Sequence, residues 1–208
     1  MYPKFYSLEQ EKRERIINAA LKEFARIGYD RASTNEIIKE ANIAKGSLFT
    51  YFNNKKELYL FLLDYVVEII EKIYDEVDWN ETDLFKRIRE TGLIKFRIMK
   101  KFPQVFNFLK TVSLEDAAEV KSEIDKISRH VLESGFKRGY KNLDLTKFRD
   151  DIDVEKTINI INWVALSFAE QEFEKVKSFD DINMDPLGEW NGYADLMKRC
   201  FYKKEENQ

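Results

Sequence analysis

The chain has 208 residues, and its 35 Lys and Arg against 38 Asp and Glu give a formal net charge of -3 at pH 7. A hydrophobic content of 44% leaves ample side chains for a core, which excludes wholesale disorder. A single Cys and a single His exclude a disulfide framework and a Cys/His metal site, so we expect neither a metal nor a cofactor. Only 7 Gly and 3 Pro are present, which favours long helices and predicts an all-α fold.

Membrane insertion and export are not indicated. The most apolar stretch, residues 59–70, contains Asp64 and Glu68 and is too short to span a bilayer. The first residues include Glu9 and Glu11, where a signal peptide would need an apolar run. We therefore expect a cytoplasmic protein with no membrane partner.

The charge is distributed unevenly along the chain. The first 56 residues carry 11 Lys and Arg against 7 Asp and Glu, whereas the remaining 152 carry 24 against 31. A small basic segment on a larger acidic body indicates that the segment meets a polyanion. A surplus of four charges is modest and also compatible with chance. The local residue pattern therefore has to decide whether the segment binds a polyanion.

The basic segment is predicted to form three helices. Apolar residues recur at helical spacing over residues 16–27, and Gly28 ends the pattern. A capping box follows, with Ser33 as the N-cap and Glu36 reaching back to it. The third helix, residues 45–52, completes the set.

The connection between the second and third helices has the character of a tight turn. Asn42 tolerates the left-handed conformation that such a turn needs, and Ile43 can fill the angle between the helices. In the third helix Leu48 and Phe52 are one turn apart and are expected to face inward. The opposite side then carries a cation, a glycine, two hydroxyls and a tyrosine: Lys45, Gly46, Ser47, Thr50 and Tyr51. Such a helix is suited to a DNA major groove.

The next helix begins with two cations, Lys55 and Lys56, which oppose the helix dipole at that end. One interpretation is a bound phosphate, held by free amides and ammonium groups. The alternative is a solvated lysine pair that the capping residue Glu57 makes tolerable.

Residues 16–60 resemble the DNA-binding domain of the tetracycline-repressor (TetR-like) family. The resemblance is carried by these motifs: Ile16-Ile17-Asn18-Ala19-Ala20, Gly28-Tyr29, Thr34, Ile37, Lys45-Gly46-Ser47-Leu48 and Tyr51-Phe52-Asn53-Asn54-Lys55-Lys56-Glu57-Leu58-Tyr59. It implies a homodimeric, all-helical transcription regulator whose larger C-terminal domain binds a small molecule.

By position, the resemblance also assigns DNA contacts. It implies phosphate contacts at Thr34, Tyr51 and Lys55. It implies a recognition helix bearing Lys45, Gly46, Ser47, Phe49 and Thr50. Three positions depart from the family pattern: Asn42 stands where Gly is common, Ala44 where Ser or Thr usually caps the recognition helix, and Phe49 where Tyr is frequent.

The predicted domains are residues 1–54, a helix-turn-helix DNA-binding domain that we call the head, and residues 55–208, a ligand-binding and dimerisation domain that we call the body. In the body, helices are expected over residues 58–73, 82–101, 103–113, 116–138, 154–177 and about 185–202. The resemblance assigns dimerisation to the last two, as a four-helix bundle, although both could instead pack within one monomer.

An apolar effector pocket is expected within the body. The candidate lining residues are Phe96, Met99, Phe102, Phe106, Leu109, Trp163 and Phe168. For any single one of them an ordinary core position is the favoured interpretation, but as a group they suit a mostly apolar ligand cavity.

We therefore expect a homodimeric repressor that binds a palindromic operator in double-stranded DNA and is released by a small apolar effector. An enzyme is not expected, because the chain has no phosphate loop, nucleophile elbow or metal spacing. The alternative is a ligand-independent DNA-binding activator or architectural protein.

Overall fold

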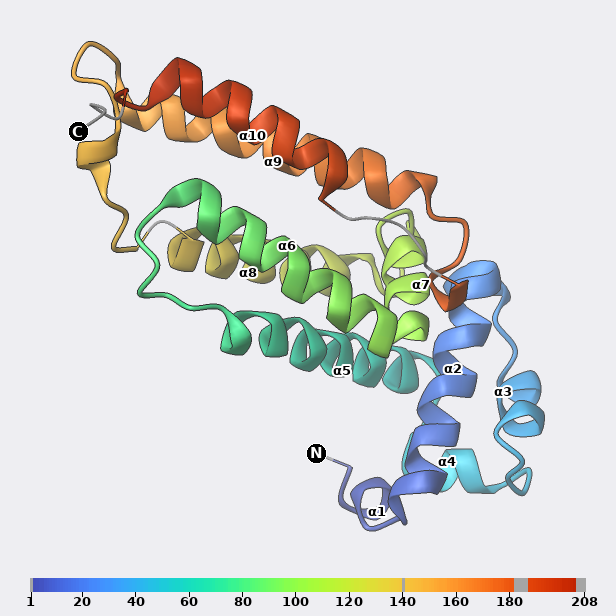
Figure 1. The fold of residues 1–208 in the computed structure, drawn as a ribbon. Coiled ribbons are helices and arrows are strands. Elements are labelled where there is room, and N and C mark those ends of the chain that lie inside the picture. The colour runs from blue at the N-terminus through green and yellow to red at the C-terminus, as the bar shows by residue number, and fades with distance from the viewer. Residues whose placement is uncertain (1, 140, 182–186, 205–208) are drawn as a thin grey trace. The chain divides into compact units, whose positions relative to one another are not determined.

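The structure, a computed structural model, describes residues 2–139, 141–181 and 187–204. Within these ranges the chain is helical, with no strand beyond an isolated bridge between Phe148 and Tyr202 (Figure 1). The α-helices are α1 (Pro3–Tyr6), α2 (Gln10–Arg31), α3 (Thr34–Glu40), α4 (Ser47–Tyr51), α5 (Lys55–Glu76), α6 (Leu84–Lys101), α7 (Pro103–Val112), α8 (Lys121–Gly139), α9 (Val154–Lys175) and α10 (Gly188–Phe201). Two 3₁₀ turns, η1 (Leu145–Lys147) and η2 (Phe179–Asp181), complete the described elements. The all-α prediction is confirmed.

Most predicted helix boundaries agree with the structure to within a few residues. Pro103 occupies the first turn of α7, as expected from its missing amide hydrogen. The helix predicted from residue 116 begins only at Lys121, because the preceding residues form turns. The predicted start of the last helix, near residue 185, lies outside the described residues. None of the helices in the described ranges is long and apolar enough to cross a membrane.

The chain divides into two compact units. The first comprises the described residues of Met1–Lys72 and Lys101–Gly135, and the second those of Ile73–Lys100 and Phe136–Gln208. The first unit therefore joins the predicted head to α7 and to parts of α5 and α8. The functional division at residues 54 and 55 stays a prediction.

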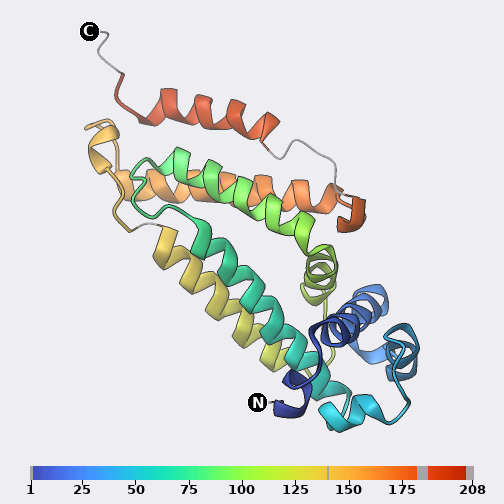
Figure 2. The same ribbon diagram turned by 60° about the horizontal axis from the view of Figure 1, so that its bottom comes forward.

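Within the first unit, α2 packs along α7 and against α3, and α1 packs against α4. Figure 2 shows α7 beside α2, and the start of α5 beside the short helices of the head. The Thr111 hydroxyl donates a hydrogen bond of 2.7 Å to the Ala25 carbonyl, which joins α7 to α2. Four fully buried aromatic rings also pack against one another in this unit: Phe24, Tyr29, Tyr59 and Phe108.

The helical conformation of α2 is interrupted at Gly28, where φ is 75° and ψ is 176°. Residues that have a side chain rarely adopt this backbone conformation, so glycine is required there. A Cβ at this position would also lie 3.2 Å from the Glu115 carboxylate. That carboxylate accepts a hydrogen bond of 2.6 Å from the Tyr29 backbone amide. Glu115, in the segment that follows α7, therefore stabilises the interruption of α2.

Within the second unit, one buried cation joins the loop before α6 to the end of α8. Arg87 is 2% exposed and donates to the Glu81, Gly139 and Lys141 carbonyls at 2.9, 3.0 and 2.7 Å. Backbone oxygens thus compensate a charge that burial would otherwise disfavour, although burial still lowers the pKa of this guanidinium. The apolar core around α9 and α10 consists of Leu84, Phe85, Phe148, Ile161, Leu187, Trp190, Ala194 and Met197.

Replacing Gly28 with alanine tests the constraint on α2. We expect Gly28→Ala to lower the free energy of unfolding by about 1 to 3 kcal/mol, because alanine would be strained at this φ. Gly46→Ala is the matched control, because φ there is -85° and a Cβ would meet nothing within 4 Å. Its effect on urea unfolding should stay within about 0.5 kcal/mol. Equal effects of the two substitutions would contradict the proposed strain.

Candidate nucleic-acid interface

Helices α3 and α4 are joined by a turn with the predicted geometry. Asn42 has φ of 51°, which confirms its left-handed conformation. The amide of Ile43 returns to the Ile38 carbonyl at 3.2 Å and closes the end of α3. The turn directs the chain into α4 without needing a glycine.

The cap of α3 is built differently from the prediction. The Ser33 side chain accepts a hydrogen bond from the Glu36 amide at 3.4 Å, so Ser33 is the N-cap as predicted. The prediction that Glu36 reaches back to Ser33 was wrong, because the Ser33 amide donates at 3.0 Å to Glu23 of α2 instead. Glu23 is 6% exposed and also pairs with Arg26 at 2.8 Å. A buried carboxylate of another helix thus holds the start of α3.

The predicted recognition helix is shorter than the sequence indicated, since α4 spans only Ser47–Tyr51. Its N-cap is Gly46, which supplies no side-chain hydrogen bond. Leu48 and Phe52 are each 1% exposed, which confirms that they face inward.

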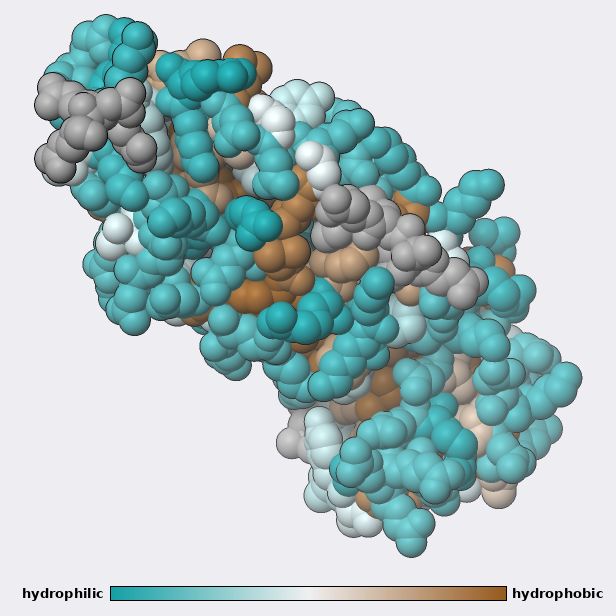
Figure 3. Space-filling view, in the orientation of Figure 1, coloured by the Kyte–Doolittle hydropathy of each residue, from teal (hydrophilic) through white to brown (hydrophobic). Residues whose placement is uncertain are grey.

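The predicted DNA-contacting residues differ in exposure. The exposed ones are Lys45, Gly46, Phe49 and Thr50, and the half-buried ones are Thr34, Ser47, Tyr51 and Lys55. Hydrophilic side chains cover most of the face of the head that Figure 3 presents. The Thr50 hydroxyl donates to the Gly46 carbonyl at 3.1 Å. The structure thus brings Lys45 to Tyr51 onto one short segment, with Thr34 at the start of α3 and Lys55 at the start of α5.

Lys55 has partners inside the protein. Its ammonium donates to the Tyr29 and Asp30 carbonyls, at 2.9 and 3.0 Å, and lies 4.6 Å from the centre of the Tyr29 ring. These carbonyls belong to the last turn of α2, where a cation also complements the helix dipole. Two of the three ammonium hydrogens are used in this way, which leaves one for an external acceptor.

Lys56 is also paired, because its ammonium lies 2.9 Å from the Glu123 carboxylate of α8. The hydrogen bond from Lys56 lowers the pKa of the Glu123 carboxyl. At the start of the helix, Glu57 accepts from the Asn53 amide at 2.8 Å, and its own amide donates to the Asn54 side chain at 2.8 Å. The two cations at the start of α5 are therefore explained without an external anion.

The apolar candidates of the body lie in both compact units. Phe96 and Met99 belong to α6, whereas Phe102, Phe106 and Leu109 precede or lie on α7. Their exposures and contacts are those of core or half-buried residues, with Phe106 2% and Met99 8% exposed. Their assignment to an effector pocket stays a prediction.

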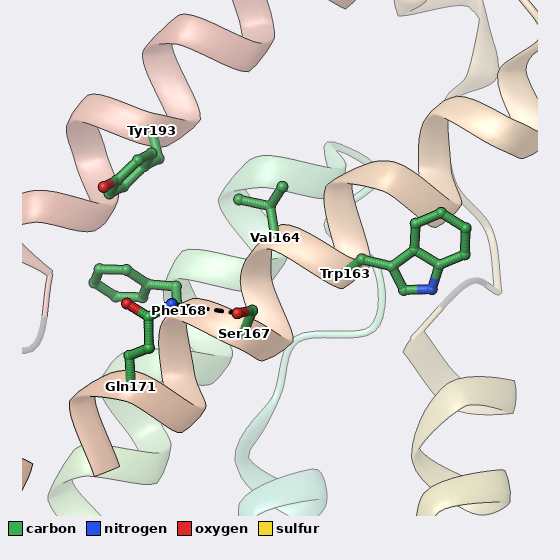
Figure 4. A pocket seen from close by; sticks show the side chains of 6 residues that line it. All are labelled: Trp163, Val164, Ser167, Phe168, Gln171 and Tyr193. Carbon is green, nitrogen blue, oxygen red and sulfur yellow. Dashed lines mark hydrogen bonds between the residues drawn. The ribbon is translucent and has the colours of Figure 1, made fainter. Parts of the chain in front are cut away.

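Trp163 and Phe168 line an open hollow of about 340 Å³ on α9 and α10 (Figure 4). The other lining residues are Val164, Ser167, Gln171 and Tyr193. Figure 4 shows Trp163 directed away from Tyr193, and it is 67% exposed. Gln171 donates to the Ser167 hydroxyl at 3.3 Å, so the floor of the hollow is partly polar.

Residues 16–61 match the family model for bacterial regulatory proteins of the tetR family. This range contains α3, the turn at Asn42, α4 and the start of α5, which are the elements that build the interface. The helix-turn-helix segment of the chain therefore belongs to the TetR-like family of regulators.

Two curated relatives and one solved structure illustrate how far the similarity of the chain to known proteins extends. The chain is 46% identical over 56 residues to the uncharacterized HTH-type transcriptional regulator YuxN of Bacillus subtilis, a match that spans 27% of the chain and 19% of YuxN. It is 22% identical over 167 residues to IcaR, a negative transcriptional regulator of the icaADBC biofilm operon in Staphylococcus aureus, covering 78% of the chain and 83% of IcaR. A TetR family regulator from Chloroflexus aurantiacus has the same fold, with a TM-score of 0.60 and 23% identity over 97% of the chain and 98% of that structure.

Proposed function

We propose that this TetR-like regulator is a homodimeric repressor that binds a palindromic operator and leaves it when a small apolar effector binds the body. The observation that carries the proposal is the short segment Lys45–Tyr51, which contains α4, exposes Lys45, Gly46, Phe49 and Thr50, and is presented by α3 and the turn at Asn42. In this proposal residues 1–54 bind DNA, and residues 55–208 bind the effector and dimerise.

The residues of α4, and Lys45 and Gly46 just before it, would contact base edges in the major groove. Base contacts are assigned to the exposed side of the segment: Lys45, Gly46, Ser47, Phe49 and Thr50. Phosphate contacts are assigned to Thr34, Tyr51 and Lys55, which flank that segment. Because nothing lies within 4 Å of a Cβ built on Gly46, a phosphate or base edge can approach this backbone closely.

A salt titration of operator binding tests the DNA contacts. For Lys45→Ala we expect the slope of log K against log salt to fall by about 0.9, because a lysine in the major groove neutralises about one phosphate charge even when its ammonium contacts a base edge. Folding stability should not change, because Lys45 is exposed. Lys55→Ala should lower both the slope and the stability, because it also removes two hydrogen bonds to the last turn of α2.

Lys126→Ala, at an exposed position on α8, is the control and should leave the slope unchanged. A slope that is the same for wild type and Lys45→Ala would remove Lys45 from the contacts.

An exposed apolar face on α9 and α10 supports the dimer. Its members are large side chains three residues apart on their helices: Ile160, Trp163 and Leu166 on α9, and Tyr193 and Leu196 on α10. The two helices pack against each other, and their inner sides fill the core of the second unit. A two-fold symmetric pairing of this face with a second copy would bury it in a four-helix bundle.

A charge placed on this face should separate the subunits. We expect Trp163→Asp to sediment as a monomer and to bind the operator more weakly, because a single short recognition helix reads only a few base pairs. Leu145→Asp is a matched control, since Leu145 is 51% exposed on η1 and outside this face. A Trp163→Asp protein that remains dimeric would overturn this assignment of the interface.

Effector binding is proposed from the apolar candidates of the body and from the family that the helix-turn-helix segment matches. The test measures operator affinity with fatty acids, acyl-CoA thioesters and hydrophobic drugs. One of these classes should weaken operator binding by about five- to 150-fold, the range of a coupling free energy of 1 to 3 kcal/mol. Calorimetric binding of the same compound to the free protein is the companion measurement. Unchanged operator affinity with every compound that binds would favour the ligand-independent alternative.

A further inference from the structure

The segment Tyr2–Leu8 lies outside the family model and packs against the recognition helix. Helix α1 contacts α4 (Figure 1), and Phe5 is fully buried between them. The Phe5 ring centre lies 5.9 Å from that of Tyr51, 5.1 Å from that of Phe52 and 5.0 Å from that of Phe61. One side chain thus touches the end of α4, its C-cap residue and α5.

Tyr2 extends the same cluster. Its ring centre lies 5.2 Å from that of Phe52 and 5.3 Å from that of Phe61. Phe52 and Phe61 are themselves 5.1 Å apart, so the rings form one continuous apolar contact. Tilted and edge-to-face ring pairs at such distances add stability beyond the area that they bury.

The segment is held in place from α2. Arg13 donates to the carbonyls of Tyr6 and Leu8, at 2.7 and 3.0 Å, and thereby caps the end of α1. The Ser7 hydroxyl donates to the Lys4 carbonyl at 2.9 Å. These bonds to three carbonyls fix the segment beside α4.

The recognition helix has little support of its own. It has five residues and no side-chain N-cap, because Ala44 and Gly46 stand where a hydroxyl would serve. An isolated helix of this length is not stable in water, so its order must come from packing. Leu48 and Phe52 are its buried residues, and Phe52 makes ring contacts with α1 and α5.

We propose that the segment Tyr2–Leu8 is a brace for the recognition helix, and that Phe5 is a positioning residue for operator binding. Phe5 would hold Phe52 and Tyr51, and through them fix the angle at which the exposed side chains of α4 meet DNA. The brace is independent of DNA, whereas its effect on operator affinity rests on the proposed function.

The test compares Phe5→Ala with wild type by amide hydrogen exchange in the full chain. Exchange over residues 47–52 should accelerate on the order of tenfold, while exchange in α7 and α9 stays unchanged. If the binding-competent orientation is then populated in about a tenth of the molecules, the apparent Kd for the operator rises about tenfold. Binding to unrelated DNA, which depends on phosphate contacts, should weaken less.

Three variants separate positioning from general loss of stability. Phe5→Leu keeps an apolar side chain and should restore exchange and affinity to within about threefold of wild type. Phe148→Ala removes an equally buried ring from the second unit and should not alter exchange over residues 47–52. Tyr2→Ala, at a half-buried position, is the milder truncation and should accelerate exchange over the same residues even if Phe5→Ala does not fold.

Unchanged exchange over residues 47–52 in both truncation variants would overturn the brace. Equal acceleration throughout the first unit would also overturn it, because that result indicates global destabilisation. Local acceleration in a protein whose wild type binds no operator would uphold the brace and reject the proposed function.

Discussion

The end of α2 is the point on which the first unit depends. Gly28 adopts a conformation that only glycine readily accepts, and the next residue, Tyr29, is bonded from both sides. Its amide donates to Glu115, which follows α7, and its carbonyl accepts from Lys55 of α5. The end of α2, the segment after α7 and the start of α5 therefore meet at one residue. The two bonds together fix the positions of these three segments relative to one another.

The side chain of Tyr29 reinforces this junction. Its ring is 1% exposed and packs against Phe24 and Tyr59, with ring centres 6.3 and 5.1 Å away. Burial raises the pKa of both phenols, so both stay neutral at physiological pH. A displacement of α7 along α2 must break the bond to Glu115 or carry Tyr29 with it. In the proposed repressor, this bond and the direct packing of α7 on α2 carry a change in α7 to the head, and Lys55 extends the link to the start of α5.

Local patterns in the sequence predicted the elements well but not their mutual contacts. Asn42, Gly28 and Pro103 act on their own backbone, so their effects could be foreseen from residue type alone. The bond between Glu115 and Tyr29 joins residues 86 positions apart, and no local spacing announces it. Helix α1 was missed because four residues carry no helical periodicity, although its aromatic side chains were visible in the sequence.

The candidate interface shows the same limit. The exposed side of α4 followed from the inward positions of Leu48 and Phe52, which the structure confirms. The cap of α3 could not be foreseen, because the decisive carboxylate, Glu23, lies on another helix. The sequence left open whether the cations at the start of α5 bind a phosphate or form a solvated pair, and it did not reveal that Lys55 and Lys56 both have protein partners.

A recognition helix that is short and uncapped has a physical consequence for the head. Because α4 cannot order itself, its orientation is set by the side chains packed beneath it, and Phe52 is the one that links it to α5. Phe49 and Thr50 are the exposed residues of α4, so substitutions there should disturb the packing beneath the helix less than substitutions of Leu48 or Phe52. The proposed DNA contacts and the packing that orders α4 thus lie on opposite sides of one short helix, and the aromatic cluster beneath it links the two by fixing the orientation of the helix.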